Sequence, residues 1–312
     1  MKLPPPGSAA LRHPLQGASA LGSGPAHTDR PLLSVVASHA AEPAPGLVVA
    51  RPFPGPDIDF VDPWIMLDHF GPTTIAPGDF GGLAPHPHRG FETVTVLFDG
   101  AMEHRDSLGR TGQLRPGGVQ WMTAASGIVH AEYREREFAR RGGVLHGVQL
   151  WLNLPAAQKM RAPGYQELPA EQIPGVATVG ARVRVIAGTH GGVQGPAHSF
   201  TPVTLIHASL DADAGASFEL PPTHNAAVYV VSGAATIGGR RVGASELALF
   251  PAAAGIIAAT AIDATEILVI GGEPIAEPVV SWGPFVMNTH EEILQARKDY
   301  AAGRMGSLQQ AA

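Results

Sequence analysis

From Leu32 onward, the chain is divided into short apolar or alternating runs, most of them bounded by glycine, proline or aspartate. These runs are rich in valine, isoleucine, leucine and threonine, as in GLVVARPF, ETVTVLF, VLHGVQLWLNL, TPVTLIHASL, NAAVYVVSG and TEILVIGG. The 38 glycines and 29 prolines favour many tight turns over long helices. Evenly spaced short strands with turns between them predict an all-β fold, either a barrel or a sandwich.

A weak internal repeat indicates two copies of one fold. When Gly100 of ETVTVLFDG is aligned with Gly233 of NAAVYVVSG, both segments read as an alternating strand that ends in a glycine turn. A second turn and strand follow in each copy, LRPGGVQWMTA in the first and RVGASELALFPA in the second. The same alignment sets Phe91 against His224, so the two copies differ at this point. We therefore expect two domains, with a linker around residues 155–180.

The expected division of the 312 residues has four parts. Residues 1–31 hold few large apolar side chains and are expected to form a disordered extension, because burial cannot offset the entropy of ordering them. Residues 32–165 form the predicted first domain, and residues 166–285 the second. Residues 286–312 form a C-terminal tail.

One helix is predicted, and it lies in this tail. The segment MNTHEEILQARKDYAAGR begins with an Asn-Thr cap, carries Glu291 and Glu292 in its first turn and stops at Gly303. A short C-terminal helix that packs on a barrel is the expected result.

The composition excludes several classes of function. No cysteine is present, which rules out disulfides, thiolate metal sites and a cysteine nucleophile. The formal net charge of −6 gives no general attraction to nucleic acid or anionic lipid. The most apolar stretch, residues 247–262, is broken by Pro251 and Gly255, and the N-terminus lacks the apolar core of a signal peptide. We expect a cytoplasmic protein that contacts neither membrane nor nucleic acid directly.

Two histidines one residue apart stand between prolines in APHPHRGF. Side chains at positions i and i+2 of an extended segment point the same way, so His86 and His88 can face one ion. Pro85 and Pro87 hold the segment away from helical geometry, so little entropy is lost when it binds a metal.

His130 and Glu132 repeat this spacing in GIVHAEY. Three imidazoles and one carboxylate from two antiparallel strands form a nitrogen and oxygen ligand set that suits iron, copper, nickel, manganese, cobalt or zinc. On an octahedral ion such a set leaves two positions open for substrate or dioxygen. The alternative for each histidine is a surface or hydrogen-bonded core residue.

Other polar residues are weaker candidates for a functional role. Glu92 follows the HPH pair closely, and we expect it to hydrogen-bond a liganding histidine rather than bind the metal. His104 and Asp106 are expected at a polar strand edge and His146 in the core, while Arg89 is expected to form a structural ion pair.

The motifs VDPWIMLDHFGP, HPHRGFETVTVLFDG, HRDSLGRTG, LRPGGVQWMTA, SGIVHAE and HGVQLWLNLP resemble the N-terminal half of the pirin family, and the ending from GGEPIAEPVV onward is similar to the pirin C-terminal tail. Pirins are two-domain members of the cupin superfamily. The resemblance implies two tandem cupin β-barrels and one metal, usually Fe²⁺, bound only in the first domain. It places the ligands at His86, His88, His130 and Glu132, and it implies a tail that packs back on the first domain.

The resemblance also implies a function. Related cupins open flavonols such as quercetin with dioxygen and release carbon monoxide, and Glu132 would then be both ligand and catalytic base. The alternative is an iron-dependent redox sensor that binds a transcription factor or metabolic enzyme. A purely structural metal is a third hypothesis. We expect a monomer that binds a flavonol-like small molecule and dioxygen, with a protein partner in the regulatory case.

Overall fold

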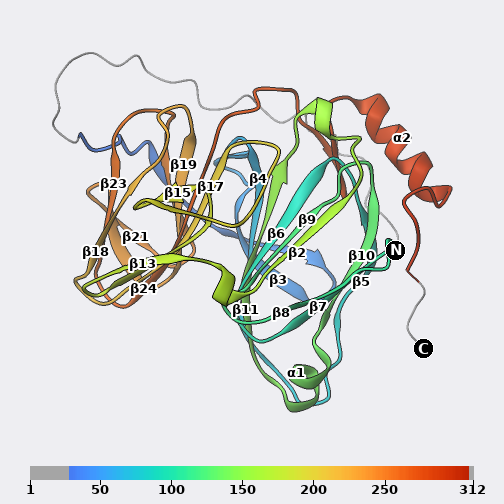
Figure 1. The fold of residues 1–312 in the computed structure, drawn as a ribbon, viewed down its shortest axis with the longest axis horizontal. Helices are drawn as coiled ribbons and strands as arrows, with labels where there is room; N and C mark the ends of the chain where they lie inside the picture. Colours follow the sequence, from blue (N-terminus) through green and yellow to red (C-terminus); the bar gives the residue numbers. More distant parts are fainter. Residues whose placement is uncertain (1–27, 309–312) are drawn as a thin grey trace.

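The computed structural model describes residues 28–308, which form 26 strands, two α-helices and two short 3-10 helices. Two β lobes lie side by side, and α2 (His290–Ala301) lies on the outer flank of the lobe formed by the first half of the chain (Figure 1). The predicted all-β fold with a short C-terminal helix is confirmed. The expected disorder of residues 1–27 falls outside the described residues.

The first lobe, here called the first barrel, contains β2 (His39–Ala44), β3 (Leu47–Phe53), β4 (Trp64–Ile75), β5 (Gly82–His88), β6 (Phe91–Asp99), β7 (Met102–Asp106), β8 (Thr111–Leu114), β9 (Val119–Thr123), β10 (Ile128–Arg134), β11 (Gly143–Asn153) and β12 (Gly164–Leu168). They form one sheet in the order β12-β9-β6-β11-β4-β3-β2 and a second in the order β5-β10-β7-β8.

The second barrel contains β1 (Ser34–Ala37), β13 (Gly175–Thr178), β14 (Ala181–Ala187), β17 (Val203–Leu210), β18 (Gly215–Glu219), β19 (Asn225–Ser232), β20 (Ala234–Ile237), β21 (Arg240–Gly243), β22 (Glu246–Phe250), β23 (Ile256–Ala261) and β24 (Thr265–Gly272). Its sheets run β1-β22-β19-β24-β17-β14-β13 and β18-β23-β20-β21. A separate hairpin, β15 (Thr189–His190) and β16 (Val193–Gln194), stands beside them.

The alternation in ETVTVLF explains how one strand serves two environments. Thr93 and Thr95 lie on the face of β6 that lines the first barrel, whereas Val94 and Val96 lie in a hydrophobic cluster shared by both barrels. Trp64 and Trp121 belong to this cluster, are fully buried and meet edge to face at 6.4 Å. Burial of each large apolar side chain contributes about 1.5–3 kcal/mol, so the seam between the barrels is a major source of stability.

Two predicted boundaries differ from the observed elements. Strand β1 falls inside the predicted first domain but pairs with β22 of the second barrel. Strand β12 crosses the predicted boundary at residues 165–166, lies within the expected linker, and pairs with β9 of the first barrel. Both β1 and β12 are short edge strands, and their sequences do not indicate which strand each one pairs with.

Residues at the start of the described chain are also ordered by the second barrel, although the extension was expected to continue to residue 31. Asp29 bridges to Ile256, and the buried Arg30 donates to the carbonyls of Pro251 and His224. The part of the predicted extension from residue 28 to 31 is therefore attached to the barrel.

The tail packs on the first barrel, as the resemblance implied. Strands β25 (Val280–Trp282) and β26 (Phe285–Met287) form a hairpin before α2, and Thr289 and Glu292 form the capping box at the start of the helix. Arg89 donates to Asp299 at 2.7 Å, so the expected ion pair of Arg89 is present.

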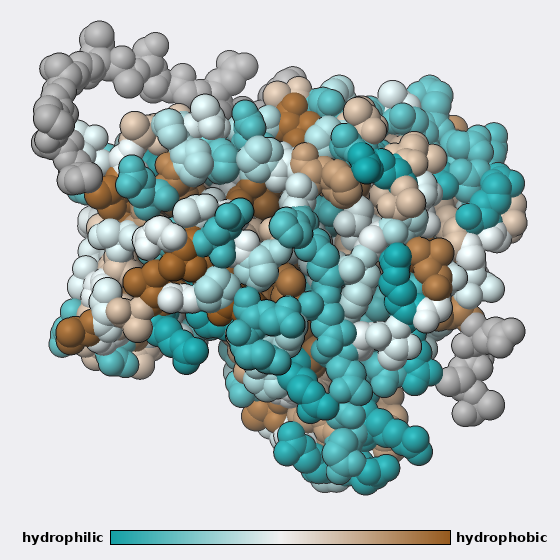
Figure 2. Space-filling view, in the orientation of Figure 1, coloured by the Kyte–Doolittle hydropathy of each residue, from teal (hydrophilic) through white to brown (hydrophobic). Residues whose placement is uncertain are grey.

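A second, shorter helix was not predicted. Helix α1 (Arg136–Arg141) has only six residues, which is too short for helical periodicity to be recognised; η1 (Ala156–Gln158) and η2 (Ala170–Gln172) are single turns. The part of the surface around α1 is largely hydrophilic (Figure 2). Among the described helices, none has the length and apolar character to cross a membrane.

Candidate metal centre

Antiparallel pairing of β5 and β10 brings the two histidine motifs together. His86 lies opposite His130 in the register of the two strands. The prolines of β5 do not interrupt this pairing of extended strands, and His86 and His88 lie on the same face, as expected from their spacing. The register shifts between His130 and Glu132, which displaces the glutamate relative to β5.

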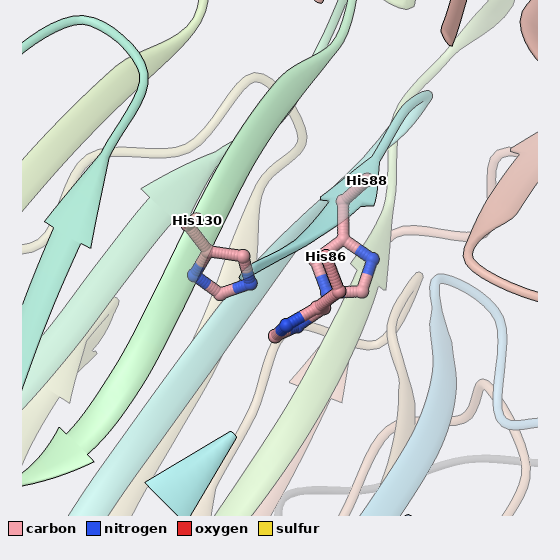
Figure 3. Close-up of side chains that lie close together, drawn as sticks. All are labelled: His86, His88 and His130. Atoms are coloured by element: carbon pink, nitrogen blue, oxygen red, sulfur yellow. The ribbon is translucent and has the colours of Figure 1, made fainter. Parts of the chain in front are cut away.

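The three imidazole rings converge (Figure 3). Ring centroids are 4.8 Å apart for His86 and His88, 4.3 Å for His86 and His130, and 4.9 Å for His88 and His130. One nitrogen of each residue lies within 4.8 Å of the corresponding nitrogens of the other two. His88 and His130 are buried, while His86 is partly exposed and marks the side from which the cluster can be reached.

Two rings have a nitrogen occupied by a backbone carbonyl. His86 Nδ1 lies 2.8 Å from the carbonyl oxygen of Ala84, and His88 Nδ1 lies 3.3 Å from that of Pro284, in the turn between β25 and β26. Since a carbonyl can only accept, Nδ1 carries the proton in both rings and Nε2 keeps its lone pair. This tautomer, held by a carbonyl, is typical of metal-binding histidines.

His130 is an orphaned polar group within the described residues. Both of its ring nitrogens are buried without a hydrogen-bond partner, an arrangement that costs free energy unless a ligand satisfies it. Burial, followed by the neighbouring histidines, holds the pKa of His88 and His130 well below the usual range. The rings of His88 and His130 are therefore neutral at pH 7, which is the form that binds metals. Such a donor set fits a divalent ion.

Glu132 lies two residues beyond His130 on β10 and is buried, but its carboxylate is not a member of the compact histidine group. It accepts hydrogen bonds from Gln120 Nε2 at 3.1 Å and from Gln149 Nε2 at 3.1 and 3.3 Å. The sequence reasoning missed both glutamines. The signal was present, because each is a polar residue inside an apolar strand, in GVQWMT and HGVQLWL.

Glu92 has a different role from the expected one. Its buried carboxylate accepts from Thr123 Oγ1 at 2.6 Å and from Ser199 Oγ at 2.9 Å, so these contacts tie it to a strand of the same barrel and to the second half of the chain rather than to a histidine. Burial raises the pKa of Glu92.

The expectation of a polar strand edge at His104 and Asp106 was wrong. Strand β7 has a partner on both sides, β10 and β8, and both side chains are buried inside the barrel. His146 is buried, as expected, and its Nε2 lies 2.8 Å from Nε2 of His69.

The profile of the pirin family matches residues 46–152, and that of the pirin C-terminal cupin domain matches residues 205–306. The chain belongs to the pirin family. It is 37% identical to the Homo sapiens protein Pirin over 280 residues, which cover 88% of this chain and 93% of that protein. It is 39% identical to a pirin-like protein of Caulobacter vibrioides over 279 residues, which cover 88% of this chain and 99% of that protein.

Solved structures agree with the family. A crystal structure of quercetin 2,3-dioxygenase from Acinetobacter baumannii matches this pirin with a TM-score of 0.85 and 34% identity, covering 90% of this chain and all of that one. A crystal structure of the Escherichia coli pirin YhhW in complex with nickel(II) has a TM-score of 0.60 and 22% identity, and it shares the fold. Two tandem cupin barrels are thereby confirmed.

Proposed function

We propose that this pirin is a metal-dependent dioxygenase that opens flavonols such as quercetin. His86, His88 and His130 are the proposed nitrogen ligands, and Glu132 is the proposed fourth ligand and catalytic base. The convergence of three imidazoles, with their ligand atoms within 4.8 Å of one another, carries the proposal. Similarity to the Acinetobacter baumannii quercetin 2,3-dioxygenase supports the choice of substrate class.

When bound, the divalent ion, which we expect to be Fe²⁺, supplies Lewis-acid and redox chemistry to the flavonol and dioxygen. His86, His88 and His130 would hold the ion, and backbone carbonyls keep the protons of His86 and His88 on Nδ1. Glu132 accepts the enol proton of the flavonol on a carboxylate oxygen. Burial of His130 and Glu132 keeps water from competing with the substrate for these groups.

The substrate approaches from the side of His86, because this is the partly exposed member of the cluster. Trp151 and Phe91 stack at 4.2 Å beside His88 and provide an apolar aromatic wall there. Such a wall suits a planar aromatic substrate better than a charged or aliphatic one.

Oxygen uptake and carbon monoxide release with quercetin test the proposal. Iron-loaded protein is compared with His86→Ala and with His198→Ala, a matched control in which an exposed histidine of the second half is removed. The proposal predicts turnover in the wild type and the control, and none in His86→Ala. Protein with full metal occupancy that turns over no flavonol would favour the redox-sensing regulator.

The monomeric state and cytoplasmic location expected from the sequence are part of this proposal, as is the division of the chain into an extension, two cupin domains and a tail. Light scattering of the metal-loaded protein after size exclusion measures the mass against 32.4 kDa for one chain. A dimer that persists on dilution would contradict the monomer.

A further inference from the structure

Two glutamines from two different strands reach the same carboxylate. Gln120 lies on β9 and Gln149 on β11, and both donate to Glu132 on β10. Gln120 is buried and Gln149 is partly exposed, so one amide holds the carboxylate from the interior and the other from the more open side. Glu132 thus receives donors from two directions, and both of its oxygens are engaged.

The direction of each amide is fixed by a further residue. Trp151 Nε1 donates to Gln149 Oε1 at 3.3 Å, and an indole nitrogen can only donate, so Nε2 of Gln149 must face Glu132. Tyr165 donates its hydroxyl proton to Gln120 Oε1 at 3.3 Å, which fixes Gln120 in the same sense. Burial raises the pKa of Tyr165 above its ordinary value, so the hydroxyl keeps this proton.

The outer residues are held in place themselves. The Tyr165 ring stacks on His104 with centroids 4.5 Å apart, and the Trp151 ring stacks on Phe91 and contacts His88 at 5.2 Å. The sequence of contacts from Trp151 through Gln149, Glu132 and Gln120 to Tyr165 therefore spans the interior of the barrel next to the histidine cluster.

We propose that Gln120 and Gln149 are positioning residues that set the orientation of Glu132 toward the metal and the substrate proton. This inference rests on the proposed role of Glu132. A carboxylate held by two amides whose own directions are fixed has few orientations available. Loss of one amide frees it to rotate, and loss of such outer contacts typically costs 10–100-fold in metal affinity or activity.

Gln149→Met tests this directly, since methionine keeps the length and flexibility of the side chain but removes its amide. Gln194→Met, an exposed position on β16, is the matched control. Both proteins are loaded with Co²⁺, whose visible absorption reports its ligand geometry. Affinity is measured by titration, and kcat and KM for quercetin are measured on the iron forms.

We expect Gln149→Met to bind Co²⁺ about 10-fold or more weakly, with a changed absorption spectrum, and to lower kcat more than it raises KM. The control should match the wild type. An unchanged spectrum and affinity in Gln149→Met would overturn the inference, since a merely structural glutamine would leave both intact. Because the spectrum is recorded without quercetin, the inference can be judged even if the wild type turns over no flavonol.

Trp151→Phe provides a second, milder variant for the case in which Gln149→Met does not fold. It keeps the aromatic packing and removes only the indole N–H that fixes Gln149. The same spectral change in smaller measure is expected, and a spectrum identical to that of the wild type would count against the inference.

Discussion

The two barrels share one strand plan but have different interiors. The sheet β5-β10-β7-β8 of the first barrel corresponds to β18-β23-β20-β21 of the second. His86 opposes His130 in the first, whereas the corresponding strands β18 and β23 of the second carry no histidine and pair Ala216 with Ala259. One interior presents imidazoles and a carboxylate, whereas the other is an apolar cluster.

The comparison shows that the fold does not by itself create the site. Corresponding strands carry chemistry in one copy and apolar packing in the other, so function lies in the side chains placed on a shared scaffold. Both ring nitrogens of His130 are buried without a hydrogen-bond partner, which lowers stability, whereas the side chains of the apolar cluster in the second barrel carry no such cost apart from packing. Four predictions test this difference between the barrels, in order of decreasing expected effect.

Phe218→Ala should have the largest effect on stability. Phe218 is fully buried in the apolar interior of the second barrel, and truncation of such a side chain costs about 3–5 kcal/mol. Urea unfolding of the metal-free protein measures the loss. Metal affinity of the folded variant should equal that of the wild type, and a large loss of affinity would show that the two interiors are not independent.

His130→Ala should change metal affinity rather than the packing of the second barrel. The variant is expected to lose about 100-fold or more in metal affinity, equivalent to ~2.7 kcal/mol, because it removes a buried proposed ligand. Added metal should raise the melting temperature of the wild type and not that of the variant. Retention of tight metal binding without His130 would show that the metal binds elsewhere.

Asp299→Asn should loosen the tail from the first barrel. Burial alone would raise the pKa of Asp299, but hydrogen bonds from Arg89, Arg304 and Gln295 outweigh it and lower the value to about 2. The carboxylate therefore stabilises the fold above its unfolded pKa of 3.8, and this contribution is lost as the pH falls toward 2.

A charged hydrogen bond contributes about 1.5–3 kcal/mol, so Asp299→Asn should lose an amount of this order at pH 7. Limited proteolysis should cut the tail sooner in the variant. Equal cleavage of the two proteins would show that the ion pair with Arg89 does not hold the tail.

The smallest effect concerns the seam. His69 Nδ1 lies 2.9 Å from the hydroxyl of Tyr229 across the two barrels, and Nε2 meets His146. Burial, followed by the proximity of His146, lowers the pKa of His69 from 6.5 to about 4. The unfolded chain binds more protons between these values, so stability should fall as the pH drops from about 6.5 toward 4.

His69→Phe should reduce this dependence by at most about 1.4 kcal/mol per pH unit. The measurement is the free energy of unfolding in urea at several pH values. An unchanged slope would assign the acid sensitivity to another group at the seam, His146, whose pKa is also lowered by burial.

The fold and the histidine cluster followed from the sequence because they depend on local rules. Alternation and turn residues identify strands, and the spacing of His86 and His88 places both on one face. The repeat that aligned Gly100 with Gly233 corresponds to β6 and β19, which occupy equivalent places in their sheets. The strands and the shared face of His86 and His88 require no knowledge of distant partners, whereas the meeting of this pair with His130 was implied by the resemblance to pirins.

The features that the sequence did not indicate depend on contacts between residues far apart in the chain. Gln120 and Gln149 are 29 residues apart, and only the ladder of β9, β6 and β11 brings their amides to Glu132. His104 was misplaced at an edge because the second neighbour of β7 is not visible in its own sequence. The roles of Glu92 and the pairing of β1 were missed for the same reason, since both involve contacts between halves of the chain.

The exchange of edge strands has a consequence for dissecting the molecule. Strand β1 precedes the first barrel yet completes a sheet of the second, so the covalent order of the chain and the grouping of its strands disagree. Any cut between the barrels leaves the second one with an unsatisfied row of backbone donors and acceptors along β22. Expressing the two cupin units as separate proteins therefore requires grafting residues 28–37 onto the C-terminal fragment, a permutation rather than a simple truncation.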